Sequence, residues 1–359
     1  MPSLFDTLQL GAVAAPNRIL MAPLTRARAT RDHVPTPVMV DYYRQRAGAG
    51  LILSEATGIS PQGLGWPYAP GLWSDEQVEA WKPVTAAVHA AGGHILAQLW
   101  HMGRVVHSSI TGEQPVSASA TQADGNAHTY DGKQPYEAAR ALGLDEIPAL
   151  LDDYRRAARN ARRAGFDGVQ LHAANGYLID QFLRDATNRR DDRYGGSIEN
   201  RIRLLTEVTQ ALIDEVGAVR VAVRLSPNDG VNGTEDSDPE SLFVAAAAAL
   251  DRLGIAFLEM RASRPDSSFV EGERDLVPAI RAVFARPLVL NSDYGLDDGQ
   301  AALDEGRADA IAYGRPYIAN PDLVTRLRAR APLAEPQPAT FYTQGPEGYV
   351  DYPALEAVG

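Results

Sequence analysis

The sequence of 359 residues contains no cysteine and only two lysines. Without cysteine, the chain cannot form disulfides, thiolate nucleophiles, iron–sulfur clusters or cysteine-bearing zinc sites. Lys82 and Lys133 fall in a predicted helix and in a long polar segment, which disfavours a Schiff-base aldolase. Any redox chemistry therefore has to come from a bound organic cofactor, or from a metal held by histidines and carboxylates.

Long apolar runs and an excess of positive charge are also missing. The longest apolar run, residues 242–250, is far shorter than the roughly 20 residues that a bilayer-spanning helix needs. The formal net charge of −12 repels both nucleic-acid phosphates and anionic lipid headgroups. The first residues lack the pattern of a secretory signal. We therefore expect a cytoplasmic enzyme with neither a nucleic-acid nor a membrane partner.

Eight short apolar segments recur along the chain, each separated from the next by enough residues for a helix. This alternation is typical of βα units in a parallel sheet. The predicted strands are 18–22, 51–55, 95–99, 168–172, 220–225, 256–260, 288–291 and 310–313. The predicted helices include 75–91, 147–164, 197–216, 239–253, 275–283 and 296–305. Together they predict an α/β fold built as a single (β/α)8 TIM barrel.

No composition shift or Ser/Gly linker divides the chain, so residues 1–359 are predicted to form one domain. Residues 8–14 have the alternating, glycine-containing pattern of an N-terminal hairpin that closes the barrel floor. The segment 102–143, after the third strand, exceeds the usual loop length and is interpreted as an excursion or lid over the barrel mouth. The C-terminal tail, 332–359, is a second segment that can shape a pocket.

Active-site groups of such barrels lie at the carboxyl ends of the strands. After the seventh and eighth strands come Ser292-Asp293 and Gly314-Arg315, where barrels often bind a phosphate. This position predicts a phosphorylated ligand. The alternative is that Arg315 only pairs with a surface carboxylate.

Two polar side chains lie on barrel strands themselves. Gln98 and Arg224 can offer an amide and a cation to a flat heterocycle, and an arginine beside a redox ring stabilises the negative charge of its reduced form. The alternative is that each belongs to a polar network inside the barrel. Both interpretations stay open on the residues alone.

The fourth strand ends in three polar residues of complementary chemistry. His172 and Asn175 can donate hydrogen bonds to one carbonyl or nitro oxygen, and the Tyr177 phenol can act as a general acid. The alternative is a packed histidine beside a structural tyrosine. No metal is expected, because the histidines of the long segment lack the spacing of a metal site.

At these positions the chain closely resembles the old yellow enzyme family of FMN-dependent ene reductases, over essentially its full length. The segments that carry the resemblance are APLTR (22–26), QLWHMGR (98–104), AGFDGV (164–169), HAANGYL (172–178), YGGSIENR (194–201) and GRP (314–316). Relatives with a cysteine at the position of Thr25 form another branch, and relatives with histidine at the position of Asn175 differ in the pair that binds substrate.

The resemblance implies a non-covalent FMN, reduced by NADPH or NADH, that passes a hydride to an α,β-unsaturated aldehyde, ketone, imide or nitroalkene. It implies FMN contacts from Pro23, Leu24, Thr25, Ala56, Gln98, Arg224, Ser292, Asp293, Gly314 and Arg315. It further implies that His172 and Asn175 bind the activating oxygen and that Tyr177 donates the proton. The substrate pocket would be lined by Trp66, Trp100 and Tyr342.

Two other functions stay open beside the ene reductase. A non-flavin barrel that isomerises or cleaves a sugar phosphate would also explain the predicted phosphate site, and it predicts a colourless protein. A non-catalytic flavin-binding protein would bind FMN without turnover. Both a monomer and a homodimer are compatible with the sequence.

Overall fold

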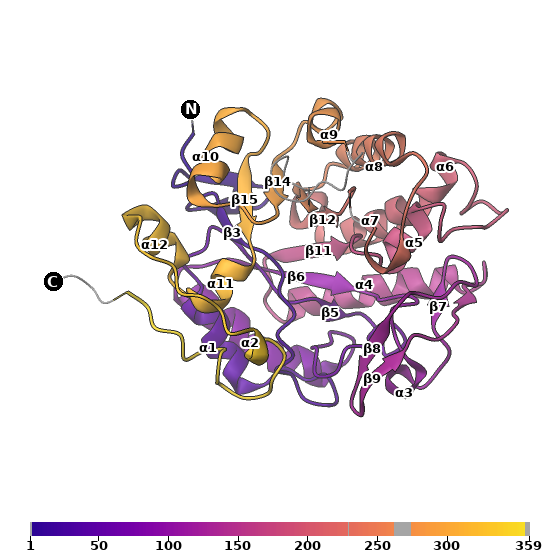
Figure 1. Ribbon diagram of the computed structural model, residues 1–359, viewed down its shortest axis with the longest axis horizontal. Helices are drawn as coiled ribbons and strands as arrows, with labels where there is room; N and C mark the ends of the chain where they lie inside the picture. Colours follow the sequence, from indigo (N-terminus) through magenta and orange to yellow (C-terminus); the bar gives the residue numbers. More distant parts are fainter. Residues whose placement is uncertain (1, 229, 262–273, 356–359) are drawn as a thin grey trace.

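Parallel strands close into a barrel in the computed structural model, which describes residues 2–228, 230–261 and 274–355 (Figure 1). The barrel strands are β3 (Ile19–Met21), β4 (Ile52–Leu53), β6 (Ile95–Trp100), β11 (Gly168–His172), β12 (Val221–Leu225), β13 (Phe257–Arg261), β14 (Leu288–Asn291) and β15 (Ala310–Tyr313). The pairings β15–β3 and β11–β6 complete the ring, and β5 (Thr57–Gly58) pairs with the end of β6. The predicted (β/α)8 barrel is confirmed.

Strand residues alternate between two buried faces, as the two-residue period of a strand requires. In β12, Val221, Val223 and Leu225 pack in the cluster between the barrel and its helices. Ala222 belongs instead to the cluster inside the barrel, and Arg224 lines a cavity at its mouth. A strand buried on both faces therefore reads as a continuous apolar run, broken only where a polar group faces the interior.

Helices surround the barrel (Figure 1). The helices of seven or more residues are α1 (Pro37–Gln45), α2 (Asp75–Ala90), α4 (Ile147–Arg163), α7 (Arg203–Val216), α8 (Pro239–Leu253), α9 (Val277–Val283), α10 (Leu296–Asp304) and α12 (Leu323–Ala329). The shorter ones are α3 (Ser108–Thr111), α5 (Leu178–Leu183), α6 (Ile198–Arg201) and α11 (Arg315–Ala319). Side chains cap several starts; in α2, for example, the Ser74 hydroxyl accepts from the Gln77 amide and the Gln77 side chain accepts from the Ser74 amide.

Three details of the predicted helices differ. The helix expected over 197–216 is divided into α6 and α7 at Ile202, which is the C-cap of the first and the N-cap of the second. The helix expected from residue 275 begins at Val277, because the Asp275 carboxylate accepts the Val277 amide from outside the helix. The helix α1 was not singled out in the sequence.

The predicted N-terminal hairpin is confirmed as β1 (Leu8–Leu10) paired antiparallel with β2 (Val13–Ala15). Leu10, Val13 and Ala15 pack in the cluster that fills the barrel interior. The Ala12 amide donates to the carbonyl of Val219, which lies just before β12, at a distance of 2.8 Å. The hairpin thus closes the amino-terminal end of the barrel, opposite the end where ligands bind.

The segment 102–143 forms small elements of its own: α3, β7 (Val116–Ser117), β8 (Asn126–Thr129), β9 (Gly132–Pro135) and β10 (Arg140–Ala141). Strands β8 and β9 pair as an antiparallel hairpin. Ala123, Ala127 and Tyr136 from this segment pack against Trp100 at the barrel mouth. Part of the segment therefore packs against the end of β6 at the barrel mouth.

The C-terminal tail is held against the barrel by buried arginines. Arg28 donates to the carbonyls of Thr340, Phe341 and Glu347, and Arg26 donates to the carbonyl of Gly348. Figure 1 shows the tail, in yellow, passing close to α1 and α11. Among the helices that the structure describes, none combines the length and apolar character needed to cross a membrane.

Candidate active site

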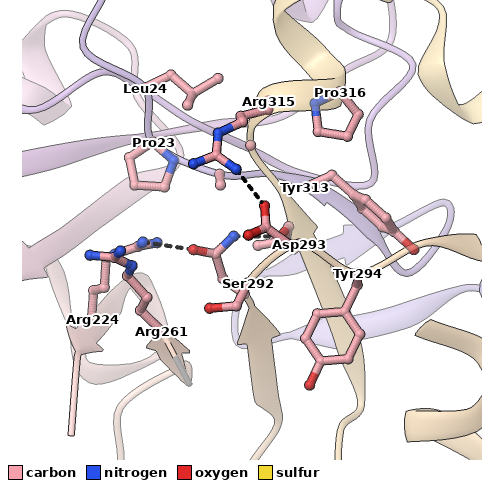
Figure 2. Close-up of a pocket in the computed structure, with 14 residues that line it drawn as sticks. Pro23, Leu24, Arg224, Arg261, Ser292, Asp293, Tyr294, Tyr313, Arg315 and Pro316 are labelled. Atoms are coloured by element: carbon pink, nitrogen blue, oxygen red, sulfur yellow. Dashed lines mark hydrogen bonds and ion pairs between the residues drawn. The ribbon is translucent and has the colours of Figure 1, made fainter. Parts of the chain in front are cut away.

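A cavity of about 170 Å³ opens at the carboxyl ends of five neighbouring strands, β12 to β15 and β3. Its lining is Ala22, Pro23, Leu24, Arg224, Arg261, Asn291, Ser292, Asp293, Tyr294, Ala312, Tyr313, Gly314, Arg315 and Pro316 (Figure 2). Seven of these residues were predicted to contact FMN. Three arginines against one carboxylate make the lining positive, which suits an anionic ligand.

Arg315 and Asp293 lie at the outer edge of this cavity. Their side chains form an ion pair of 2.9 Å and are 71% and 65% exposed (Figure 2). The alternative in which Arg315 pairs with a surface carboxylate is thus observed. Exposed pairs are weak, so an incoming phosphate can exchange for the carboxylate at little cost in free energy.

Gln98 and Arg224 belong to one polar chain that crosses the barrel interior. The Gln98 amide donates to Gln170 (2.8 Å), whose own amide donates to Glu259 (2.6 Å), and Glu259 binds the Arg224 guanidinium. Arg224 also donates to the Asn291 side chain at 2.8 Å. The interior-network alternative is therefore confirmed for both residues, while Arg224 also reaches the cavity.

Glu259 is the charged centre of this chain and was not identified from the sequence. Burial raises its pKa, whereas Arg224 and the Gln170 amide act in the opposite direction by stabilising the carboxylate. The three groups together keep one positive and one negative charge buried beneath the mouth. A buried cation remains near the predicted flavin position only because its counter-charge is buried with it.

His172, Tyr177 and Trp100 form an aromatic cluster at the mouth. Their ring centroids are 4.9 Å apart for His172–Tyr177 and for Trp100–Tyr177, and 6.3 Å for Trp100–His172. Within the described part of the chain, the buried Nδ1 of His172 and Nε1 of Trp100 have no hydrogen-bond partner. Buried polar atoms are normally satisfied, so these two point to a ligand.

The protonation states of this cluster follow from its burial. Loss of solvent, together with the charges of Arg224 and Arg261, holds the pKa of His172 well below its usual value, so the imidazole is neutral. Burial raises the pKa of Tyr177, and Arg261 opposes this rise. The phenol therefore carries its proton at neutral pH and is available as a donor.

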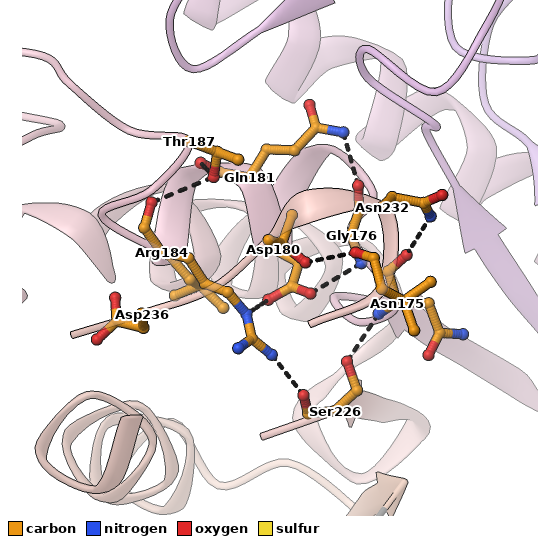
Figure 3. Close-up of polar contacts among 12 residues, drawn as sticks. Asn175, Gly176, Asp180, Gln181, Arg184, Thr187, Ser226, Asn232 and Asp236 are labelled. Atoms are coloured by element: carbon orange, nitrogen blue, oxygen red, sulfur yellow. Dashed lines mark hydrogen bonds and ion pairs between the residues drawn. The ribbon is translucent and has the colours of Figure 1, made fainter. Parts of the chain in front are cut away.

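Asn175 and Gly176 lie in a tight turn between β11 and α5 (Figure 3). The Gly176 amide donates to Asp180 at 2.9 Å, and the Gln181 side chain donates to the Gly176 carbonyl at 2.8 Å. Gly176 has φ +75°, and a Cβ there would lie 2.4 Å from the Val231 carbonyl oxygen, so only glycine fits. The turn brings Asn175 and Tyr177 to the same mouth as His172.

The remaining predicted site residues lie around this centre. Trp66 contacts Tyr342, with ring centroids 5.2 Å apart, and both lie against His128 of the excursion. Ala56, Trp66, Trp100 and Tyr177 share one apolar cluster. Thr25 is half-buried beside the cavity residues Pro23 and Leu24.

Sequence reasoning missed Arg261, because it ended the sixth barrel strand at Met260. In the structure Arg261 is the last residue of β13, lines the cavity and contacts Asn175. A charged residue directly after the run FLEM was the available signal. Across the described residues, no group of three or more potential metal ligands is brought together.

The chain matches known proteins over nearly its whole length. The family described as "NADH:flavin oxidoreductase / NADH oxidase family" matches residues 3–334. The structure of the old yellow enzyme homologue from Zymomonas mobilis is 63% identical, with a TM-score of 0.97 over 99% of this chain and 100% of that chain. Morphinone reductase in complex with tetrahydroNAD is 48% identical, with a TM-score of 0.94 over 99% of this chain and 98% of that chain. The 12-oxophytodienoate reductase 1 of Oryza sativa subsp. japonica is 41% identical over 362 residues, which cover 99% of this chain and 94% of the relative.

Proposed function

The chain belongs to the NADH:flavin oxidoreductase family of old yellow enzymes, whose cofactor is FMN, and from this premise we propose that it is an ene reductase. Its substrates would be small molecules with an alkene activated by a carbonyl, imide or nitro group. Membership of a flavin family does not fit the sugar-phosphate isomerase or lyase that the phosphate site alone allowed. It also makes the enzyme more plausible than a non-catalytic flavin carrier.

The lining of the cavity supports FMN binding. Ser292, Gly314 and Arg315 would hold the phosphate, with the Asp293 backbone beside them, and Arg224 would face the pyrimidine edge of the ring. Pro23 and Leu24 provide an apolar wall. Thr25, Ala56 and Gln98 would complete the contacts of the ring. A positive charge near this edge stabilises the reduced, anionic flavin.

The aromatic cluster and the turn supply the groups for alkene reduction. Hydride chemistry between NADH or NADPH and Cβ of the alkene would be supplied by FMN bound in the cavity. Neutral His172 and the Asn175 amide would bind the activating oxygen and stabilise the charge that develops on it, as an oxyanion hole does. The Tyr177 hydroxyl would donate its proton to Cα. Trp66, Trp100 and Tyr342 would position the substrate and exclude water.

One observation carries this proposal: the buried ring of His172, whose Nδ1 has no hydrogen-bond partner among the described residues, lies in contact with the ring of Tyr177. Most buried side-chain polar atoms have a hydrogen-bond partner within the protein, so an unpartnered nitrogen at the barrel mouth favours a ligand-binding role. A binding pocket for a polar oxygen leaves the partner to the ligand. The adjacent phenol supplies the proton that hydride addition to an alkene requires.

Visible absorption of the purified protein under anaerobic conditions tests the proposal. We expect a yellow protein that bleaches with NADH or NADPH and regains its colour with 2-cyclohexenone. The saturated cyclohexanone is the matched control and should leave the bleached protein unchanged. A protein that stays bleached with the enone would refute alkene reduction, and one that stays colourless after incubation with FMN would refute the cofactor.

A further inference from the structure

We infer that Arg261 is a positioning residue, which fixes the carboxamide of Asn175 so that its NH2 group faces the substrate oxygen. The inference deepens the proposed function and rests on it, because it concerns how one of the two oxygen-binding groups acquires its orientation. It concerns a residue at the end of β13 that neither the motifs nor the predicted site contained.

The contact itself decides the orientation of the amide. Arg261 Nη1 lies 3.2 Å from Asn175 Oδ1. A guanidinium carries only donors, so it can bind the oxygen of a carboxamide and never its nitrogen. A flipped amide would place its NH2 hydrogens against the positive guanidinium. The chemistry of the pair therefore removes the ambiguity that an asparagine side chain usually has.

The backbone of Asn175 is fixed independently of this contact (Figure 3). Its amide donates to the Ser226 hydroxyl at 2.7 Å, and its carbonyl accepts from the Asn232 side chain at 2.9 Å. Its φ of +59° lies in the left-handed region, which asparagine tolerates better than most residues. With the backbone held on both sides, the freedom that remains is that of the side chain, and Arg261 restricts it.

The same guanidinium also acts on the neighbouring groups. Its charge helps to lower the pKa of His172, which keeps that donor neutral, and it counters the rise in the pKa of Tyr177. A cation on the oxygen end of a carboxamide polarises the group and makes its N–H a stronger donor. Arg261 thus acts on substrate mainly through Asn175, and its removal should have a much smaller effect once Asn175 is gone, limited to its charge on His172 and Tyr177.

A double-mutant cycle tests this coupling. The variants are Arg261→Met, which keeps the length of the side chain but removes its donors and charge, Asn175→Ala, and the two combined. Each FMN-loaded protein is reduced with dithionite and reoxidised anaerobically by 2-cyclohexenone. Dioxygen is the control oxidant, because its reaction with the reduced flavin does not need an amide that binds a substrate carbonyl oxygen. Arg274→Met removes a cation that is 81% exposed and lies 3.2 Å from the Glu240 carboxylate, and it is the control variant.

We expect Arg261→Met to slow reoxidation by the enone about tenfold and to leave the rate with dioxygen unchanged. In the Asn175→Ala background, Arg261→Met should cause a much smaller further loss, of about twofold or less. Arg274→Met should match the wild type with both oxidants. FMN content and near-ultraviolet circular dichroism report whether each variant is folded, and Arg261→Leu replaces Arg261→Met if the latter does not fold.

Losses that multiply in the double variant would overturn the inference, since Arg261 would then act independently of Asn175. An unchanged enone rate in Arg261→Met would overturn it as well. Equal slowing with enone and dioxygen would assign Arg261 to the flavin rather than to Asn175. If Asn175→Ala itself leaves the enone rate unchanged, Asn175 does not bind the substrate oxygen and the role of Arg261 fails with it. The proposed function fails instead if the enone does not reoxidise the wild-type protein.

Discussion

At the scale of single residues, a buried carboxylate inside the barrel neutralises the charge of an arginine that lines the cavity at its mouth. Arg224 reaches the cavity while its guanidinium is bound to the buried carboxylate of Glu259. This arrangement sets how much positive charge the predicted flavin edge experiences. Glu259, which is connected to Gln98 by two hydrogen bonds through Gln170, should therefore influence the flavin potential as much as Arg224 does.

Changing the two members of this pair should shift the flavin potential in opposite directions. Glu259→Gln removes the negative charge behind Arg224, which favours the anionic reduced flavin, so the midpoint potential should rise by roughly 30 mV. Arg224→Ala should lower it and weaken FMN retention. Spectroelectrochemical titration of the bound flavin measures both. Glu240→Gln, on an exposed carboxylate, is the control, and equal potentials in all four proteins would contradict this role of the pair.

Tyr177 should be needed for only one of the two half-reactions. Tyr177→Phe keeps the ring packing against Trp100 and His172 but removes the proton donor. We expect the rate of flavin reoxidation by 2-cyclohexenone to fall by about 10²-fold or more, with flavin reduction by NADH largely unchanged. Stopped-flow absorbance separates the two rates. A loss shared equally by both half-reactions would point to a structural role.

Glu55 makes the stability of the protein depend on pH. It is 1% exposed, and burial raises its pKa from 4.5 to about 7, although the amides of Arg26 and Ala27 and the charge of Arg26 oppose this rise. Between these pH values the folded protein binds a proton that the unfolded chain has released. Stability from this group is therefore present below pH 4.5 and is lost as pH rises through 7, by about 3 kcal/mol.

Urea unfolding of the wild type and of Glu55→Gln measures this effect. Glutamine does not titrate, so the stability of the wild type relative to the variant should fall between pH 5 and pH 8. Taking the difference removes the contributions of all other titrating groups. Parallel curves for the two proteins would show that Glu55 ionises normally despite its burial.

The chemistry of single residues was predictable only where strand ends and motifs carry it. His172 and Tyr177 follow a strong strand pattern, and the structure brings both to the mouth. Arg261 and Glu259 were missed because their importance lies in contacts with residues 86 and 35 positions away. Spacing along a chain does not report such contacts; only the closed barrel makes them.

At the scale of elements, the barrel strands were predictable because both their faces are buried. Each predicted strand falls within a few residues of its observed bounds, and β11, β14 and β15 match fully. The short strands β7 to β10 were not predictable, since they have two to four residues each and lie in a polar segment. Their structure depends on packing against the mouth rather than on local pattern.

The attachment of the C-terminal tail should govern the substrate pocket as well as stability. Arg28→Gln removes the hydrogen bonds that the guanidinium donates to the carbonyls of Thr340, Phe341 and Glu347, on either side of Tyr342. We expect a loss of about 2–4 kcal/mol in unfolding free energy. The KM for 2-cyclohexenone should also rise, because the tail places the Tyr342 ring against Trp66 and His128.

Arg44→Gln is the matched control for this change. Arg44 lies in α1, and its ion pair with Asp41 is exposed, so its removal should alter stability by no more than about 0.5 kcal/mol. Urea unfolding and steady-state kinetics on both variants make the comparison. Similar effects for Arg28→Gln and Arg44→Gln would show that the tail does not depend on the buried arginines.

At the scale of the whole molecule, we propose that residues 1–359 unfold as one domain. The floor hairpin and the catalytic mouth lie at opposite ends of the same barrel, and clusters of buried side chains connect the strands between them. If the barrel has a single cooperative core, a change that destabilises one end should lower the stability of the other end equally. A change at the floor, far from FMN, is therefore a test of domain organisation.

Gly11→Ala provides that change. Gly11 has φ +59°, and a Cβ there would lie 2.1 Å from the Val219 carbonyl oxygen. The hairpin therefore has to shift away from the start of β12. Gly112 has φ +78° with no atom within 4 Å of such a Cβ, so Gly112→Ala adds only the backbone strain, about 1 kcal/mol. The difference between the two variants isolates the steric contact.

We expect Gly11→Ala to lower the free energy of unfolding by about 1–3 kcal/mol more than Gly112→Ala does. The loss of FMN absorbance, which reports on the mouth, and tryptophan fluorescence should shift together, because one core supports both ends. Enone reduction below the midpoint should remain that of the wild type, since the floor does not contact the site. Separate transitions in FMN absorbance and tryptophan fluorescence would instead show that the chain has independently unfolding parts. The hairpin would then stabilise only the part at the amino-terminal end of the barrel.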